Sequence, residues 1–75
     1  MTLSETEFGK KYTVVKIDVS DSIKRRIFDI GLTKGSLVTP LYCSFLGEPT
    51  AYLIRGAVIA LRDDETKRIF VKPVS

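Results

Sequence analysis

Three consecutive carboxylates and a lone cysteine are the residues of this sequence best suited to metal binding or nucleophilic catalysis. Asp63, Asp64 and Glu65 could supply oxygen ligands to a hard cation, but adjacent carboxylates on a helical turn usually form a solvated face at a helix N-terminus. Cys43 has no histidine to activate it, since the chain contains none, and its apolar neighbours indicate a core or half-buried position. We therefore expect no catalytic residue, no metal site and no cofactor.

Basic and aromatic side chains could serve a different chemistry, because lysine and arginine neutralise the phosphates of a nucleic acid while exposed rings stack on its bases. Lys24 to Arg26 could contact phosphate, yet the net charge is only +3 and the charges are scattered along the chain. The aromatic residues lie within apolar patterns, which favours core packing of Tyr12, Phe28, Tyr42, Phe45, Tyr52 and Phe70. No glycine motif for phosphate is present. A nucleic-acid partner is not expected.

Length and composition predict one small domain in a reducing compartment. Seventy-five residues are too few for two folds, so a single domain is expected over residues 1–75. One cysteine cannot form an internal disulfide, and the polar start contains no apolar run of signal-peptide length. No stretch approaches the roughly 20 apolar residues of a transmembrane helix. We expect a cytoplasmic protein that meets a membrane only through a partner.

The first half of the chain predicts a strand followed by a short helix. Residues 11–19 are rich in β-branched residues and predict a strand, one face of which carries Thr13, Val15, Ile17 and Val19. Residues 20–31 predict an amphipathic helix that Gly31 ends in a left-handed conformation and that begins at Ser20, Asp21 or Ser22. The apolar face of this helix is expected to carry Ile23, Ile27 and Ile30.

A bent strand is predicted next. The segment 32–35 is a turn that includes Gly35, and residues 36–45 predict a strand with a proline in its middle. Pro40 cannot donate a hydrogen bond to a neighbouring strand, so it must lie at an edge or at a bulge. Strong bending of a long strand in a small domain suggests a barrel.

The remaining elements complete a mainly β fold. Three further strands are expected at residues 50–55, 57–61 and 69–73. The chain is expected to reverse at Gly56, and residues 62–68 to form a polar helical turn before the last strand. Short strands punctuated by glycine and proline are typical of a small SH3-like or OB-like β-barrel. We expect about five strands and one short α-helix inserted after the first strand.

The segment 50–55 is unusual because both faces of the expected strand carry apolar groups. One face has Thr50, Tyr52 and Ile54, and the other has Ala51, Leu53 and Arg55. A single-layer barrel buries only one of these faces. Either the helix covers the second face, or Leu53 and its neighbours form an exposed patch that a partner would bury.

The order and spacing of several short motifs over about two thirds of the chain resemble the FeoA family, small cytosolic accessory proteins of bacterial ferrous iron uptake. The matching positions are a helix end, a turn glycine, a Gly-x-Pro loop, an Arg-Gly reversal, an apolar strand and an Ile-x-Val terminus: Arg26, Ile27, Ile30, Gly31, Gly35, Gly47 to Pro49, Arg55, Gly56, Ile59 to Arg62, Ile69 and Val71. The chain departs from the family pattern at Lys34, where proline is common, at Glu48, where aspartate is common, and at Phe28 and the helix isoleucines, where leucine is common.

This resemblance implies an SH3-like barrel that acts without catalysis and a partner, the cytosolic G-protein domain of the membrane ferrous iron transporter FeoB. The same fold is found in the C-terminal domain of iron-dependent repressors of the DtxR type. A regulatory module that acts with a metal-dependent repressor or a nucleic acid is therefore the alternative. A direct iron carrier is a further alternative, against which the absence of histidine argues.

The contact residues that we expect for the partner lie in one loop and the strand that follows it. They are Leu46, Gly47, Glu48 and Pro49, together with Tyr52, Leu53 and Arg55. Gly31, Gly35 and Gly56 are expected to serve backbone turns. Exposed strand edges of a small barrel could also pair two copies weakly.

Overall fold

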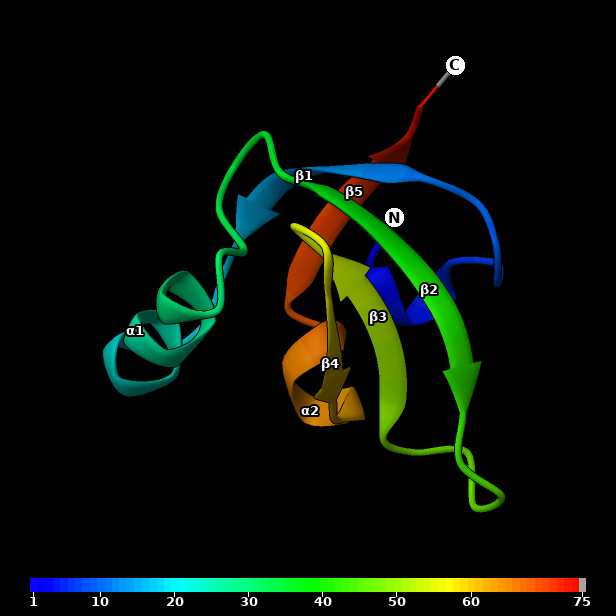
Figure 1. Cartoon of the computed structure of the whole chain (residues 1–75). Helices are drawn as coiled ribbons and strands as arrows, with labels where there is room; N and C mark the ends of the chain where they lie inside the picture. Colours follow the sequence, from blue (N-terminus) through cyan, green and yellow to red (C-terminus); the bar gives the residue numbers. More distant parts are fainter. Residues whose placement is uncertain (75) are drawn as a thin grey trace.

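The computed structural model describes residues 1–74, and it is a single antiparallel sheet with two helices and a short 3-10 turn (Figure 1). The elements in chain order are η1 (Leu3–Glu5), β1 (Tyr12–Ile17), α1 (Asp21–Asp29), β2 (Leu37–Cys43), β3 (Thr50–Ile54), β4 (Ala57–Leu61), α2 (Asp63–Thr66) and β5 (Ile69–Pro73). The strand order is β4-β3-β2-β1-β5. The expectation of five strands with a helix after the first is confirmed.

The sheet curls around the core, but its two outer strands are not joined by a ladder. Within residues 1–74, no pairing of β4 with β5 is found, and α2 forms the connection between them. The short turn η1 packs against both α2 and β5. In a closed barrel, hydrogen bonds would join β4 to β5. Here η1 and α2 occupy that place.

The predicted bend at Pro40 is confirmed. The register of β2 against β3 shifts between Pro40 and Tyr42, and the side chain of Pro40 is buried. Proline lacks the N–H that a regular ladder would use, so a bulge is where it costs least.

The expected common face of Thr13, Val15, Ile17 and Val19 is interrupted in the structure. Tyr12 and Val14 point into the core, whereas Val15 is exposed. The register against β5 shifts between Val14 and Lys16, so one extra residue is inserted and the inward and outward positions exchange beyond it. Ile17, three residues after Val14, then packs against the core. Period-two reading of the sequence cannot locate such an insertion.

The core draws on every layer of the molecule. Eleven buried side chains form one cluster: Leu3, Tyr12, Val14, Ile27, Leu32, Val38, Tyr52, Ile54, Leu61, Ile69 and Val71. From α1, Ile27 is fully buried while Ile23 and Ile30 pack against the cluster, which confirms the predicted helix face. A domain this small depends on nearly all of its apolar residues in this way.

The N-terminal turn was not predicted. Leu3 is fully buried there, and the Glu5 carboxylate accepts hydrogen bonds from the Thr2 N–H at 2.6 Å and from the Thr2 hydroxyl at 2.9 Å. These bonds hold the pKa of Glu5 below its usual value. The Thr-x-x-Glu spacing is a capping box, and it is the sequence signal that would have revealed the turn.

The end of α1 is a Schellman motif at Gly31, as the sequence predicts. The Gly31 N–H donates to the Phe28 carbonyl at 2.9 Å and the Leu32 N–H to the Ile27 carbonyl at 3.1 Å. Gly31 has φ +91°, and a Cβ placed on it would lie 2.5 Å from Cδ of Arg55. Gly31 is therefore favoured both by its backbone conformation and by the close approach of the Arg55 side-chain stem.

Several side chains that were expected in the core are exposed instead. Phe28, Tyr42, Phe45 and Cys43 all face solvent. Phe28 follows Ile27 in α1 and is turned about 100° around the helix away from it, and Tyr42 and Cys43 follow the bulge in β2. The apolar pattern around them reflects strand propensity rather than burial.

Replacing Gly31 with alanine tests this packing. We expect Gly31→Ala to lower the free energy of unfolding by about 2–5 kcal/mol, because about 1–2 kcal/mol of left-handed strain adds to the overlap with the Arg55 stem. The matched control is Gly9→Ala, which has φ +84° and open space around its Cβ position and should lose only the strain. Urea denaturation measures both.

The same comparison in an Arg55→Ala background isolates the side-chain contact. There the difference between the Gly31 and Gly9 variants should shrink toward zero. If the difference in unfolding free energy between the two variants stays unchanged, the Arg55 side chain does not contact position 31 in solution.

Candidate functional site

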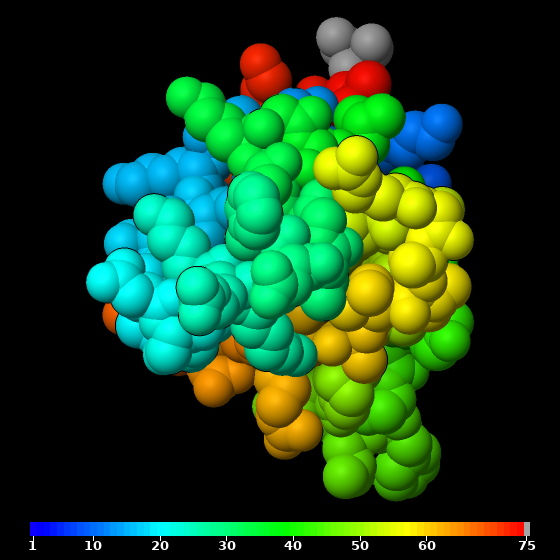
Figure 2. Space-filling model, turned by 60° about the vertical axis from the view of Figure 1, so that its left-hand side comes forward, coloured from blue at the N-terminus to red at the C-terminus, as the bar shows by residue number. Residues whose placement is uncertain are grey.

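The β2–β3 loop (residues 44–49) projects from the end of the sheet and carries an apolar tip. In Figure 1 it is the green turn that extends beyond β2 and β3, and Figure 2 shows it standing out from the rest of the surface. Phe45 is fully exposed and Leu46 is 84% exposed. Two large apolar side chains at a loop tip are a typical feature of a surface that binds a partner.

Hydrogen bonds at its base close this loop. The Ser44 N–H donates to the Pro49 carbonyl at 3.2 Å, the Ser44 hydroxyl donates to the Glu48 carbonyl, and the Gly47 N–H donates to the Ser44 carbonyl at 2.9 Å. Gly47 has φ +88°, and the peptide bond between Glu48 and Pro49 is cis. The three hydrogen bonds hold the loop closed and leave its tip side chains free.

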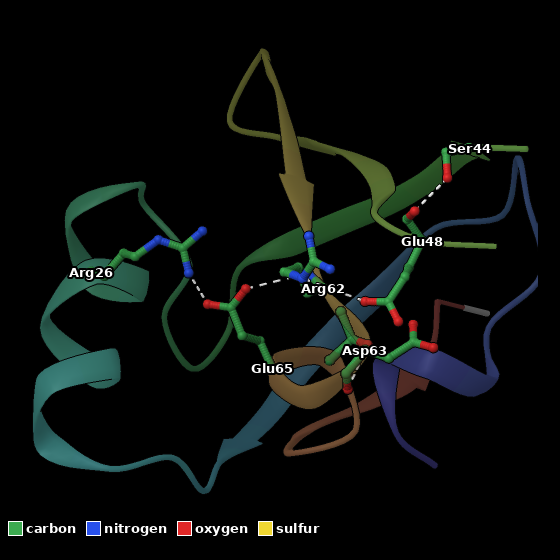
Figure 3. A network of polar contacts seen from close by, with 7 residues as sticks. Arg26, Ser44, Glu48, Arg62, Asp63 and Glu65 are labelled. Carbon is green, nitrogen blue, oxygen red and sulfur yellow. Dashed lines mark hydrogen bonds and ion pairs between the residues drawn. The ribbon is translucent and has the colours of Figure 1, made fainter. Parts of the chain in front are cut away.

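The side chain of Glu48 connects the loop to the end of β4. Its carboxylate lies 3.6 Å from Nε of Arg62, as Figure 3 shows. Both side chains are partly exposed, so this ion pair contributes little stability by itself.

Glu65 continues the network toward α1. Its side chain is only 7% exposed, one oxygen pairs with the Arg26 guanidinium, and the other accepts the Arg62 N–H at 3.3 Å (Figure 3). The residue types of the segment 62–68 are too polar to predict a place in the core, and this is wrong for Glu65 and for Thr66, which are buried. The carboxylate avoids an unpaired burial because a cation from another element covers it.

Tyr52 is not at the surface. Only 2% of it is exposed, and its burial raises the pKa of its phenol. The prediction that Tyr52 contacts a partner is therefore wrong. Ile54, two residues further along β3, shares its inward face, and the ring is one of the largest groups in the core.

Leu53 lies on the other face of β3 and is 39% exposed. It pairs across the sheet with Val58, which is exposed, and with Thr39, and the exposed Leu37 is two residues before Thr39. Of the two arrangements left open by the sequence, the exposed patch is the one found. We call Leu37, Leu53 and Val58 the outer apolar patch.

Arg55 and Gly56 form the reversal that the sequence predicts. Both have positive φ, +52° and +81°, which is the conformation of a two-residue type I′ hairpin between the paired Ile54 and Ala57. The stem of Arg55 lies against Gly31 and its side chain is exposed. Arg55 therefore supports the packing of the turn on α1 and still presents its charge to solvent.

Gly35 serves a turn of a different kind. It has φ +93°, and its N–H donates to the Val14 carbonyl at 2.8 Å, while the Val14 N–H donates to the Ser36 carbonyl at 2.9 Å. These two bonds attach the connection between α1 and β2 to the middle of β1.

Phe45 is the functional candidate that sequence reasoning missed. Its position in an apolar run favoured a longer strand, whereas β2 ends at Cys43 and the loop begins at once. The available signal was the Gly-x-Pro pair after it, because a loop closed by those residues starts before them.

The part of the chain that the structure describes offers neither a metal cluster nor a membrane span. No group of three or more His, Cys, Asp or Glu within residues 1–74 is placed to hold a metal ion, and no helix there is long and apolar enough to cross a bilayer.

Comparison with known proteins identifies the family. The model of the FeoA domain matches residues 1–73. A relative from Porphyromonas gingivalis (strain ATCC BAA-308 / W83), described as an Fe(2+) transport protein A/Fe(2+) transporter FeoB fusion protein, is 28% identical over all 75 residues. The chain spans 9% of the length of that relative.

Solved structures agree with this assignment. The FeoA protein of Chlorobium tepidum has a TM-score of 0.94 at 28% identity, covering 100% of this chain and 71% of that one. The Stenotrophomonas maltophilia FeoA complexed with zinc, described as a prokaryotic SH3 domain protein, has a TM-score of 0.82 at 32% identity, covering 96% and 89%. A manganese-dependent transcriptional repressor shares the fold over 36% of its length, with a TM-score of 0.88 at 22% identity.

Removing Arg26 tests the buried end of the network. We expect Arg26→Met to lower the free energy of unfolding by about 1–3 kcal/mol, because Glu65 would keep a buried charge without its cation while the half-exposed site lets water recover part of the loss. Chemical denaturation at neutral pH measures it. The neighbouring Arg25→Met, on the exposed face of α1, should cost no more than about 0.5 kcal/mol.

Adding Glu65→Gln to Arg26→Met should recover part of the lost stability, since the amide keeps an acceptor for the Arg62 N–H and removes the charge. Equal stability of Arg26→Met and Arg25→Met would show that the ion pair between Arg26 and Glu65 does not stabilise the fold.

Proposed function

The chain belongs to the FeoA family of non-catalytic accessory domains in ferrous iron transport, and from this we propose that it docks on the cytosolic G-protein domain of a FeoB-type membrane transporter. It would act in the cytoplasm and reach the membrane through that partner. The proposed contact surface is the β2–β3 loop with the outer apolar patch and Arg55.

The observation that carries this proposal is the relative in which the two proteins form one chain. Joining a binding module to its partner raises the effective concentration of the contact without any new interaction. A domain that works by docking gains directly from such a fusion, which supports FeoB as the partner here.

The shape of the β2–β3 loop supports docking rather than catalysis. Phe45 and Leu46 are exposed, and a partner pocket that buries them would gain roughly 1.5–3 kcal/mol for each side chain. The loop is already closed by its backbone hydrogen bonds, so little ordering entropy is lost when it binds. Leu46, Gly47, Glu48 and Pro49 remain in the proposed contact set, with Leu53 and Arg55, and Tyr52 is removed from it.

Action with a repressor or a nucleic acid has weaker support. The likeness to the manganese-dependent repressor is at 22% identity and concerns the fold. A domain that neutralised several phosphates would show an affinity for DNA or RNA that falls steeply with salt, and this behaviour distinguishes the two hypotheses.

The loop tip can be tested against the transporter directly. We expect the G-protein domain of the FeoB transporter from the same organism to bind the wild-type protein, and the double variant Phe45→Ser/Leu46→Ser to bind at least tenfold more weakly, because the two anchors are lost. Calorimetry or biolayer interferometry measures the affinity. Thermal unfolding should be nearly unchanged, since neither side chain contacts the core.

The control variant is Phe8→Ser, which removes an exposed ring far from the loop in the sequence. It should bind as the wild type does. Equal binding by the loop variant and the control would remove the loop from the contact surface, and no binding by the wild type, together with normal iron uptake in a deletion strain, would refute the partnership.

A further inference from the structure

The second half of β1 has one edge without a strand partner in residues 1–74. β1 pairs with β2 only at Tyr12↔Val38 and Thr13↔Leu37, whereas its pairing with β5 continues to Ile17↔Ile69. Beyond Thr13, the connection to β2 is attached to Val14 and then turns away toward α1. The edge formed by residues 15–17 is therefore available to another extended chain.

The backbone of Ile17 points toward this open edge. The Asp18 N–H donates to the Arg68 carbonyl at 2.9 Å, so Asp18 and Arg68 form a hydrogen-bonded pair of the β1–β5 ladder. Hydrogen-bonded pairs alternate along an antiparallel ladder, so the N–H and carbonyl of Ile17 face the opposite side. They are the donor and the acceptor that an added strand would use.

A groove of about 390 Å³ runs beside this edge. Its apolar lining comes from Val15, Ile17, Phe28 and Leu32, and α1 forms its far wall. Figure 2 looks onto this side of the molecule, with α1 in cyan next to the blue residues of β1. Phe28, which no core contact explains, here covers one side of a place for apolar side chains.

The charged residues that line the groove are all positive. Lys16, Lys24 and Lys34 line it from β1, α1 and the following turn, and none of its lining residues is acidic. Among the described residues no carboxylate forms an ion pair with any of the three, although Lys16 lies 5.8 Å from the centre of the Phe70 ring. Three unpaired cations around an apolar groove attract an anionic partner.

We propose that this groove binds an extended, acidic peptide segment that adds a strand to β1, with apolar residues at every second position. Main-chain hydrogen bonds to Ile17 would set its register, alternate side chains would enter the apolar groove, and its carboxylates would meet the three lysines. This surface is separate from the β2–β3 loop.

The charges argue against the other occupants. A second copy of the chain pairing edge to edge would bring two sets of three lysines together, which is repulsive. A nucleic acid would satisfy the lysines but has no peptide backbone to pair with Ile17. An acidic strand satisfies the edge, the groove and the charge together.

A synthetic peptide tests the proposal. The probe is a fluorescein-labelled peptide of alternating glutamate and valine, eight residues long, titrated into the full chain and followed by anisotropy and by amide NMR. We expect saturable binding with a Kd below about 1 mM and protection of the Ile17 amide from hydrogen exchange. Lys24→Glu/Lys34→Glu should weaken binding at least tenfold, whereas the charge-matched Lys11→Glu/Lys72→Glu, away from the groove, should weaken it by less than threefold.

Backbone pairing is tested by a peptide with N-methylated central residues, which should lose binding. The proposal is overturned if no binding occurs at about 1 mM, if the methylated peptide binds equally well, or if the shifted amides lie at residues 44–49 instead of 15–17. The experiment contains no transporter, so its failure leaves the docking on FeoB to its own test.

Discussion

The carboxylate of Glu65 holds together parts of the chain that the sheet does not connect. Through Arg26 it reaches α1, and through the backbone of Arg62 it fixes the start of α2. The Arg62 side chain then reaches Glu48 at the base of the loop. Removing the cation would be costly, because Glu65 is buried and a buried charge without its partner is far less favourable than an exposed one. One acidic side chain therefore links α1 to the start of α2, alongside the apolar packing of α1 on the core.

The open ends of the sheet make this dependence physically reasonable. In a closed barrel, backbone hydrogen bonds would join β4 to β5 and fix the elements at the seam. Here η1 and α2 occupy the seam, with Leu3 and Leu61 buried in the common core. At the seam between β4 and β5, side-chain interactions replace backbone hydrogen bonds. Side-chain interactions are more sensitive to single substitutions than a strand ladder is.

Local signals in the sequence were enough to predict the order of the elements. Gly31 and the pair Arg55–Gly56 mark a helix end and a hairpin because their left-handed conformations leave few residue choices, and Pro40 marks a bulge because it lacks an N–H. The expected common face of Val15 and Ile17 is interrupted because one inserted residue exchanges inside and outside, and nothing in the residue types reveals it.

The candidate site was harder to predict because its residues are defined by tertiary contacts. The burial of Tyr52 depends on which face of β3 meets the core, and that of Glu65 on a cation 39 positions away. Phe45 has the composition of a strand residue and the position of a loop residue. The loop residues Leu46 to Pro49 were predicted from the glycine and proline, whose effect is local.

The self-contained closure of the β2–β3 loop has a consequence for how such a protein can diverge. Ser44 and Pro49 join the two ends of the loop by one backbone hydrogen bond, and the tip side chains are exposed. New tip residues can therefore be tried with little effect on folding, whereas changes at Glu65 disturb several elements at once. Partner choice can drift from one lineage to another on a scaffold that stays the same.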